Sequence, residues 1–352
     1  MGTIITNAGV SDDAAIHQAP PGEEAPPGNG GSLWAKLAFF IAVPIAFWFI
    51  AFFFIKTPIF RKHFDQDWIS ASSPVYTARN VNCEIVVYGD SSAITGVDPE
   101  VVQKMTHLKT CNIAQSKGAL VVLGTGGLDV YLRNNQRPKY LVIQFAGPNF
   151  YKPTSWADSP GFMEGIVPLI RYFPKRDLIS LLPRHPEVIT GVLTYAFLAG
   201  PESVWKSRHS PLKIAGSPET PINVHFVRTE PAYSSCKQQA DGDRIFHKPD
   251  PAFISGLRER YSKLADHLII DVAPDTECDQ RVPYLRAHLG GLDNTLQQYP
   301  VTLFNDGYTH YAPAGSLRLS QELANQINSY HAPEQNSLAN VATHPVVPGS
   351  QR

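Results

Sequence analysis

The chain has 352 residues, of which 43% are hydrophobic and 17% are charged, so it can fill the core of one large or two ordinary domains. Its formal net charge of −1 at pH 7 argues against general binding of nucleic acid or another polyanion. The four cysteines form no Cys-x-x-Cys pair, and the twelve histidines lack the spacing of metal ligands. We therefore expect neither a metal centre nor a cofactor.

The N-terminal region combines a polar tail with an apolar run. Residues 1–32 are rich in Ala, Pro and Gly without apolar periodicity, which predicts a disordered tail. Residues 37–55 carry no charge, and at about 1.5 Å per residue a helix of this length crosses about 30 Å of hydrocarbon. Trp34 and Lys56 flank the run as interfacial side chains do. We therefore expect a transmembrane helix over 33–56 that anchors the chain in a lipid bilayer, with a buried soluble helix as the alternative.

Two signals disagree about which side of the membrane carries the rest of the chain. The tail has no Lys or Arg, whereas Lys56, Arg61 and Lys62 follow the run, and the positive-inside rule then places the C-terminal part in the cytoplasm. Cys83 and Cys111 favour the other side, because each opens an expected strand and neighbouring strands would let them bridge. Two disulfides fit an oxidising compartment, and four buried thiols are the alternative. We expect a single-pass protein of a bacterial-type inner membrane with an extracytoplasmic domain, and its orientation stays open.

From about residue 75, expected strands alternate with expected helices. Strands are predicted at 83–88, 110–113, 139–146, 267–273 and 300–304, and helices around 98–107, 119–135, 251–266 and 314–330. This alternation predicts a parallel sheet with helices on both faces, a three-layer α/β/α domain over 75–330. The Pro- and aromatic-rich stretch 150–250 breaks the rhythm and is expected to form a helical insertion, and 331–352 is expected to be a disordered tail.

Polar side chains follow two of these strands. Gly89-Asp90-Ser91 comes directly after the first strand, and the last strand is followed by Asp306 and His310. The carboxyl ends of parallel strands gather at one edge of a sheet, so these residues can meet there. A serine, a histidine and a carboxylate together turn a weak hydroxyl nucleophile into an attacking group. A simple turn is the alternative interpretation of Gly-Asp-Ser, and Ser92 is a rival nucleophile.

Four blocks in this order, around Ser91, Gly118, Asn149 and His310, resemble the SGNH (GDSL-like) hydrolase and acyltransferase superfamily. The resemblance covers about 80–150 and 265–330 and implies a flavodoxin-like fold. It also implies Ser91 as nucleophile, His310 as base and Asp306 as the group that orients it. The Ser91 backbone, Gly118 and Asn149 would form the oxyanion hole.

One spacing departs from the family pattern. Asp306 lies four residues before His310, where the family usually has three, and Gly307 occupies the family position. A turn at Gly307 can restore the geometry because glycine relaxes backbone limits. Without it, the site would be a Ser–His dyad or an inactive relative.

With the preceding apolar helix, the chain most resembles anchored members of this family, including alginate O-acetylation and teichoic-acid D-alanylation proteins. That resemblance implies a membrane-anchored serine esterase or O-acyltransferase that forms an acyl-serine. The expected substrate is a cell-envelope polysaccharide, with a membrane acyl donor as partner. The alternatives are an inactive scaffold that binds such a polymer and a membrane-anchored interaction protein with no enzymatic site.

Two further features receive simpler interpretations. The glycines at 124, 126 and 127 lack the Lys-Ser/Thr of a phosphate loop, so nucleotide binding is disfavoured. A basic cluster in the insertion is interpreted as a solvated face, and an anion-binding site is the less favoured alternative. Its members are Arg171, Lys175, Arg176, Arg184 and His185.

Overall fold

A computed structural model gives the fold of the chain. The described residues are 30–59, 67–117, 119–120, 124–152, 162–172, 224–225, 231–238 and 247–342. The expected N-terminal tail, most of the insertion at 150–250 and Gly118 lie outside them. Two compact units make up the chain, Met1–Phe47 and Trp48–Arg352.

Helix α1 (Gly30–Ile55) is the main element at the N-terminal end of the described chain. Its large apolar side chains are mostly exposed, among them Trp34, Phe40 and Ile50. Across the described residues, however, no helix combines the length and the hydropathy that a membrane crossing requires. A helix is therefore present where the transmembrane helix was expected, over 33–56, but it does not meet the criteria for a membrane span.

The core of the second unit is a parallel sheet of four strands in the order β2-β1-β3-β4. These strands are β1 (Ile85–Gly89), β2 (Thr110–Asn112), β3 (Tyr140–Ala146) and β4 (His267–Ala273). Every residue of β1 and β3 is buried, as continuous apolar strands in a doubly covered parallel sheet are. The predicted parallel α/β domain is confirmed.

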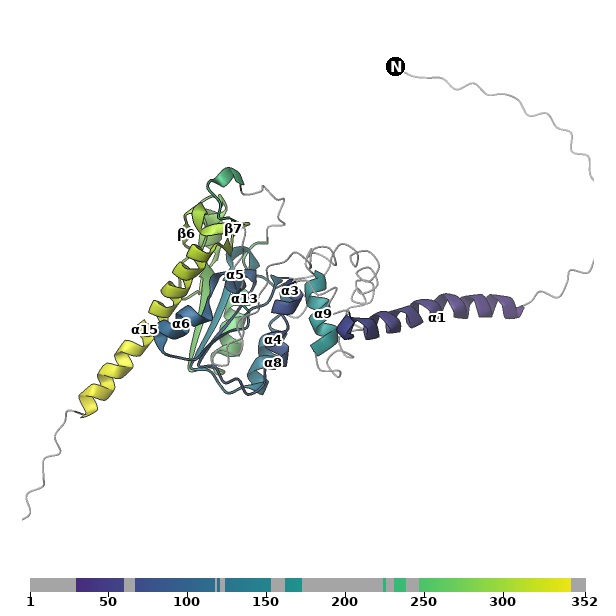
Figure 1. Cartoon of the computed structure of the whole chain (residues 1–352), viewed down its shortest axis with the longest axis horizontal. Coiled ribbons are helices and arrows are strands. Elements are labelled where there is room, and N and C mark those ends of the chain that lie inside the picture. The colour runs from purple at the N-terminus through teal and green to yellow at the C-terminus, as the bar shows by residue number, and fades with distance from the viewer. Residues whose placement is uncertain are drawn as a thin grey trace, which may run out of the picture. The chain divides into compact units, whose positions relative to one another are not determined.

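Helices cover the sheet on two sides (Figure 1). On one side lie α6 (Pro99–Thr106) and α15 (Pro313–Ala342), and on the other lie α4 (Pro74–Thr77) and α8 (Gly126–Asn134). Helix α13 (Pro251–Tyr261) contacts α8, because its Arg260 and the hydroxyl of Tyr261 bind Asp129. Helices α6 and α13 start in the same way, with an aspartate that accepts a backbone N–H and a proline in the first turn.

The prediction of a fifth strand of the parallel sheet at 300–304 was wrong. Val301–Leu303 form the 3₁₀ helix η5, and among the described strands β7 (Phe304–Asp306) pairs with β8 (His310–Tyr311) alone, in an antiparallel hairpin. The reason is Pro300, which lacks the N–H that a ladder needs. Its carbonyl instead accepts from Leu303 N at 3.0 Å, which closes a turn.

The outer edge of β4 is closed by side chains. Asp293 Oδ2 accepts from Ile270 N at 2.7 Å. Asn294 both accepts from Val272 N and donates to Val272 O, each at 2.9 Å. Two side chains thus bind the backbone groups that a further strand would bind.

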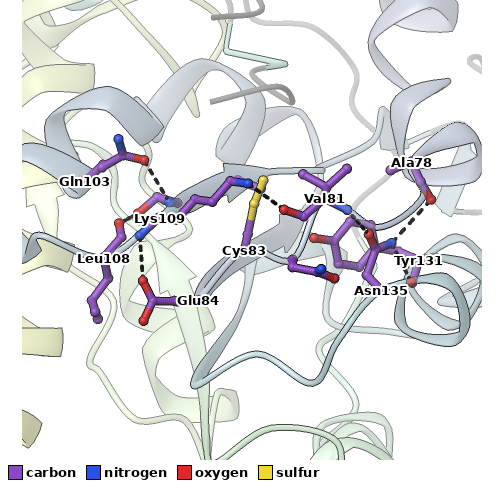
Figure 2. Close-up of a disulfide and its surroundings, with 12 residues drawn as sticks. Ala78, Val81, Cys83, Glu84, Gln103, Leu108, Lys109, Tyr131 and Asn135 are labelled. Carbon is purple, nitrogen blue, oxygen red and sulfur yellow. Dashed lines mark hydrogen bonds between the residues drawn. A yellow bond between two sulfur atoms is a disulfide. The ribbon is translucent and has the colours of Figure 1, made fainter. Parts of the chain in front are cut away.

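Two disulfides tie the second unit together. Cys83–Cys111 joins the segment just before β1 to the middle of β2, with the Cα atoms 5.8 Å apart. Figure 2 shows it beside the hydrogen bonds of Lys109. Cys236–Cys278 joins η4 (Cys236–Gln238) to the segment after β5 (Asp275–Thr276). The strands β1 and β2 are neighbours in the sheet, as expected for a bridge between Cys83 and Cys111.

The C-terminal part of α15 and several short elements complete the described chain. That helix runs on to Ala342, so the first part of the tail expected at 331–352 is helical. The short elements are α3 (Asp67–Ala71), α5 (Ser91–Gly96), η1 (Gly147–Asn149), α9 (Phe162–Tyr172) in the insertion, α14 (Val282–His288) and β6 (Gln298–Tyr299).

Candidate active site

Ser91 lies at the carboxyl edge of the sheet, just after the point where β1 and β3 approach each other closely at Gly89. A Cβ atom on Gly89 would lie 2.0 Å from the backbone oxygen of Gln144 and 2.7 Å from Cβ of Ala93. Only glycine lets β1 and β3 approach this closely. Asp90 then leaves the strand in an extended conformation and caps α5, whose first residue is Ser91.

The structure brings Ser91 and His310 together across 219 positions of sequence. His310 Nε2 lies 2.8 Å from Ser91 Oγ, and both side chains are partly buried. This distance falls in the range of about 2.6–3.2 Å at which a base can take the hydroxyl proton. The arrangement therefore permits activation of the hydroxyl.

His310 is held on several sides. The next residue, Tyr311, donates its backbone N–H to Thr95 Oγ1 in α5 at 3.3 Å and its hydroxyl to Pro274 O at 2.5 Å. The indole of Trp68 in α3 lies against the imidazole, with ring centroids 5.5 Å apart. Sequence reasoning missed Trp68, because nothing in the sequence links α3 to the hairpin.

Asp306 is placed by the same hairpin. Its backbone pairs with that of His310 across β7 and β8, and a register shift lies between Phe304 and Asp306. Gly307 opens the connecting turn with φ +66°, which favours glycine. The side chain of Asp306 lies outside the described residues, so the structure gives its backbone position opposite His310 and nothing of its carboxylate.

Asp90 is the centre of a hydrogen-bond network that sequence reasoning did not assign. The residue is fully buried. Its Oδ2 accepts from the Asn149 side-chain amide at 2.5 Å and from Ala146 N at 2.9 Å. Its Oδ1 accepts from Ser92 N at 2.8 Å and Ser92 Oγ at 2.5 Å. The carboxylate thus fixes Asn149 relative to the turn that carries Ser91.

The same network removes Ser92 as a rival nucleophile. Ser92 is fully buried and its hydroxyl donates to Asp90, whereas the hydroxyl of Ser91 contacts the imidazole of His310. The turn is therefore in the register that presents Ser91.

Two of the three predicted oxyanion donors fall on described residues. Ser91 is the first residue of α5, and the first N–H groups of a helix have no partner within it. An asparagine side chain carries two N–H donors, and Asn149 uses one on Asp90, which leaves a second beside the turn. The third predicted donor, Gly118, lies outside the described residues.

A cavity of about 540 Å³ opens beside Asn149, between α8 and α13. Its lining is mixed, with apolar side chains, glycines and charged residues. The members are Lys117, Leu120, Gly124, Thr125, Gly126, Asp129, Phe145, Asn149, Tyr151, Lys152, Asp250, Ala252, Phe253, Gly256, Leu257 and Arg260. We refer to it as the Asn149 cavity.

The remaining sequence features bear little on this site. Gly126 and Gly127 begin α8, and Gly124 belongs to the turn before it. Of the basic cluster only Arg171 is described, and its guanidinium donates to Ile55 O at 2.9 Å. Within the described part of the chain, no three His, Cys, Asp or Glu side chains gather as metal ligands would.

No protein-family model matches this chain, and neither a curated protein nor a solved structure gives a match to it.

Proposed function

We propose that the chain is a serine-dependent acyl enzyme of SGNH type, an esterase or O-acyltransferase. The observation that carries this proposal is the 2.8 Å contact between Ser91 Oγ and His310 Nε2. The placement of Asn149 beside the same turn, by its bond to the buried Asp90, supports it further.

In the first half-reaction, His310 Nε2 takes the proton of Ser91 Oγ while that oxygen attacks the ester carbonyl carbon. The Ser91 N–H and the Asn149 amide stabilise the oxyanion, and one such donor contributes about 3 kcal/mol in the transition state. The bond to the alcohol oxygen then breaks, and His310 returns the proton to the leaving alkoxide. An acyl-Ser91 remains.

In the second half-reaction, His310 takes a proton from water or from an acceptor hydroxyl, which attacks the acyl carbon. The acyl group leaves Ser91, whose oxygen regains the proton from His310. Asp306 is proposed to orient His310 and stabilise its cation, and the backbone of Gly118 to add a third oxyanion donor.

We place this chemistry at the outer face of a membrane. The exposed apolar side chains of α1 support an anchor over 33–56, and the two disulfides support an oxidising, extracytoplasmic compartment. An anchored site lies close to cell-envelope polysaccharides and to membrane acyl donors, which raises their effective concentration. We therefore propose a cell-envelope polysaccharide as acceptor or substrate.

The test is hydrolysis of a p-nitrophenyl ester by the full-length protein. We expect Ser91→Ala and His310→Ala to lower kcat by about 10²- to 10⁴-fold. The control Ser255→Ala, which removes an exposed hydroxyl of α13, should leave kcat unchanged. A serine-reactive phosphonate should label Ser91 in the wild type and leave Ser91→Ala unlabelled.

Full activity in a folded Ser91→Ala protein would end the proposal. Absence of turnover and of phosphonate labelling in the wild type would favour the inactive polymer-binding scaffold instead. The variant Asp306→Asn separates the two catalytic arrangements, because a triad predicts a large loss of kcat and a Ser–His dyad predicts almost none.

A further inference from the structure

We propose that the Asn149 cavity holds the acyl chain of the ester, so that the enzyme prefers acyl groups longer than acetyl. The inference rests on the proposed function and adds to it the class of acyl group. Asn149 both lines this cavity and binds Asp90 beside the Ser91 turn. A carbonyl held by Asn149 therefore has the cavity next to it.

The floor of the cavity is apolar. Phe145 of β3 and Leu257 of α13 are almost fully buried, at 2% and 4% exposure. Phe253 lies beside Phe145, with ring centroids 6.4 Å apart, and Leu120 adds a further apolar side chain. An unbranched alkyl chain placed here leaves water for an apolar surface, which is favourable in proportion to the area buried.

Several charged groups of the wall are engaged with the protein itself. Asp129 forms an ion pair with Arg260 and accepts from the Tyr261 hydroxyl at 2.8 Å. Asp250 accepts from Ala252 N at 2.9 Å as the cap of α13. Each carboxylate thus has a partner within the wall. Lys117 and Lys152 add two cations to the lining, of which Lys117 lies over the ring of Tyr151 at 5.9 Å, and the apolar floor is the surface for an alkyl chain.

The size of the cavity also favours a chain over an acetyl group. A volume of about 540 Å³ lies in the range of about 300–1,000 Å³ that pockets for small molecules occupy. A single methyl group would leave most of this space to water. Each added methylene should instead raise kcat/KM by up to about fourfold until the floor is covered.

Gly256 supplies the means to test this. It lines the cavity from α13, and a Cβ atom built on it meets no atom within 4 Å. A larger side chain at this position therefore enters open space instead of the protein core. The variant Gly256→Leu should fill part of the cavity without disturbing the helix.

The experiment compares kcat/KM for p-nitrophenyl acetate, butyrate and hexanoate in the full-length protein. We expect kcat/KM to rise from acetate to hexanoate, and Gly256→Leu to lower the hexanoate value at least tenfold while changing the acetate value less than twofold. The control Ser255→Leu puts the same side chain at the neighbouring exposed position, which does not line the cavity. It should keep the wild-type profile.

A second series varies the alcohol, with methyl, butyl and hexyl acetates. If Gly256→Leu lowers only the hexyl acetate rate, the cavity holds the alcohol and the acyl-chain proposal is overturned. An unchanged profile in both series overturns it as well, and leaves the proposed function standing.

Binding of hexanoate provides a readout that does not need turnover. Saturation-transfer NMR on the Ser91→Ala protein should detect hexanoate, and the additional Gly256→Leu change should abolish the signal. If the wild type hydrolyses no ester while this pattern holds, the catalytic proposal fails and the alkyl-binding cavity stands. If hexanoate does not bind, the cavity proposal fails.

Discussion

At the scale of single residues, Asp90 links the two halves of the candidate site. Four hydrogen bonds converge on its carboxylate from Ser92, Ala146 and Asn149. A carboxylate has only acceptors to offer, so it can meet four donors at once. An asparagine has one oxygen and one NH₂ group. Its NH₂ group would face two of these four donors and could not accept a hydrogen bond from either.

We predict that Asp90→Asn lowers kcat by about 10²- to 10³-fold, the effect of losing an oxyanion donor. The free energy of unfolding should fall by about 1–3 kcal/mol as well, because buried donors lose their acceptor. Ester kinetics and urea unfolding measure the two effects. Asp266→Asn, which alters only a half-exposed ion pair with Arg137, is the control. Wild-type kcat in Asp90→Asn would contradict the positioning role.

Asp271 in β4 gives a prediction about pH. Burial raises its pKa to about 7, while the amide of Gln326 lowers it by a smaller amount. The folded state keeps a proton that the unfolded chain loses near pH 4, so the contribution of Asp271 to stability falls as pH rises from about 4 to 7. Above that window the folded state carries the full penalty of a buried charge.

We therefore expect Asp271→Asn to raise the free energy of unfolding at pH 8 by about 2–4 kcal/mol and to change it little at pH 4. Urea unfolding at the two pH values measures this. A variant that loses stability equally at both values would show that Asp271 is needed for its hydrogen bond and not penalised for its charge.

The sequence pointed to Ser91 and His310 by one argument, but that argument holds only for Ser91. Ser91 follows β1 of the parallel sheet, whereas His310 lies in the antiparallel hairpin of β7 and β8 and not at the end of a parallel strand. Sequence reasoning could not reach the bond between Asp90 and Asn149, because a hydrogen bond between residues 59 positions apart leaves no periodic pattern. The contact of Trp68 with His310 was missed for the same reason.

At the scale of elements, the stability of the sheet depends on the close approach of β1 and β3 beside Ser91. We predict that Gly89→Ala destabilises the protein by about 1–3 kcal/mol or more, since the added Cβ would overlap the backbone oxygen of Gln144. The matched change Gly256→Ala meets open space in α13 and should stabilise by about 0.5–1 kcal/mol. Urea unfolding compares both, and equal stability would contradict the steric argument.

The strands of the parallel sheet were predictable because continuous apolar runs such as Tyr140–Ala146 are buried on both faces. The segment 300–304 was also apolar, but Pro300 stops the ladder and the chain turns into η5 and a hairpin. Apolar content alone does not separate these outcomes. The end of α15 was missed because residues 331–342 carry too little apolar periodicity to predict a helix.

At the scale of the whole molecule, the two disulfides differ in accessibility. Cys83 and Cys111 are buried, whereas Cys236 is exposed. We predict that mild reduction of the folded protein opens Cys236–Cys278 first, because thiol exchange needs access to the sulfur. Alkylation followed by mass spectrometry measures the order. Simultaneous opening of both would contradict it.

Loss of the buried bridge should affect the whole domain. It closes a loop of 28 positions, for which the chain-entropy relation gives about 3–4 kcal/mol. The double variant Cys83→Ala/Cys111→Ala should lose about this much free energy of unfolding, while Cys236→Ala/Cys278→Ala retains the buried bridge for comparison.

The closed edge of β4 has a consequence for how copies of the protein meet. An open strand edge invites the backbone of a second molecule to extend the sheet, which leads to swapping or fibre growth. Asp293 and Asn294 already occupy the outward amides of Ile270 and Val272. A second molecule that paired with β4 would therefore have to displace both side chains from these amides, which disfavours extension of the sheet at this edge.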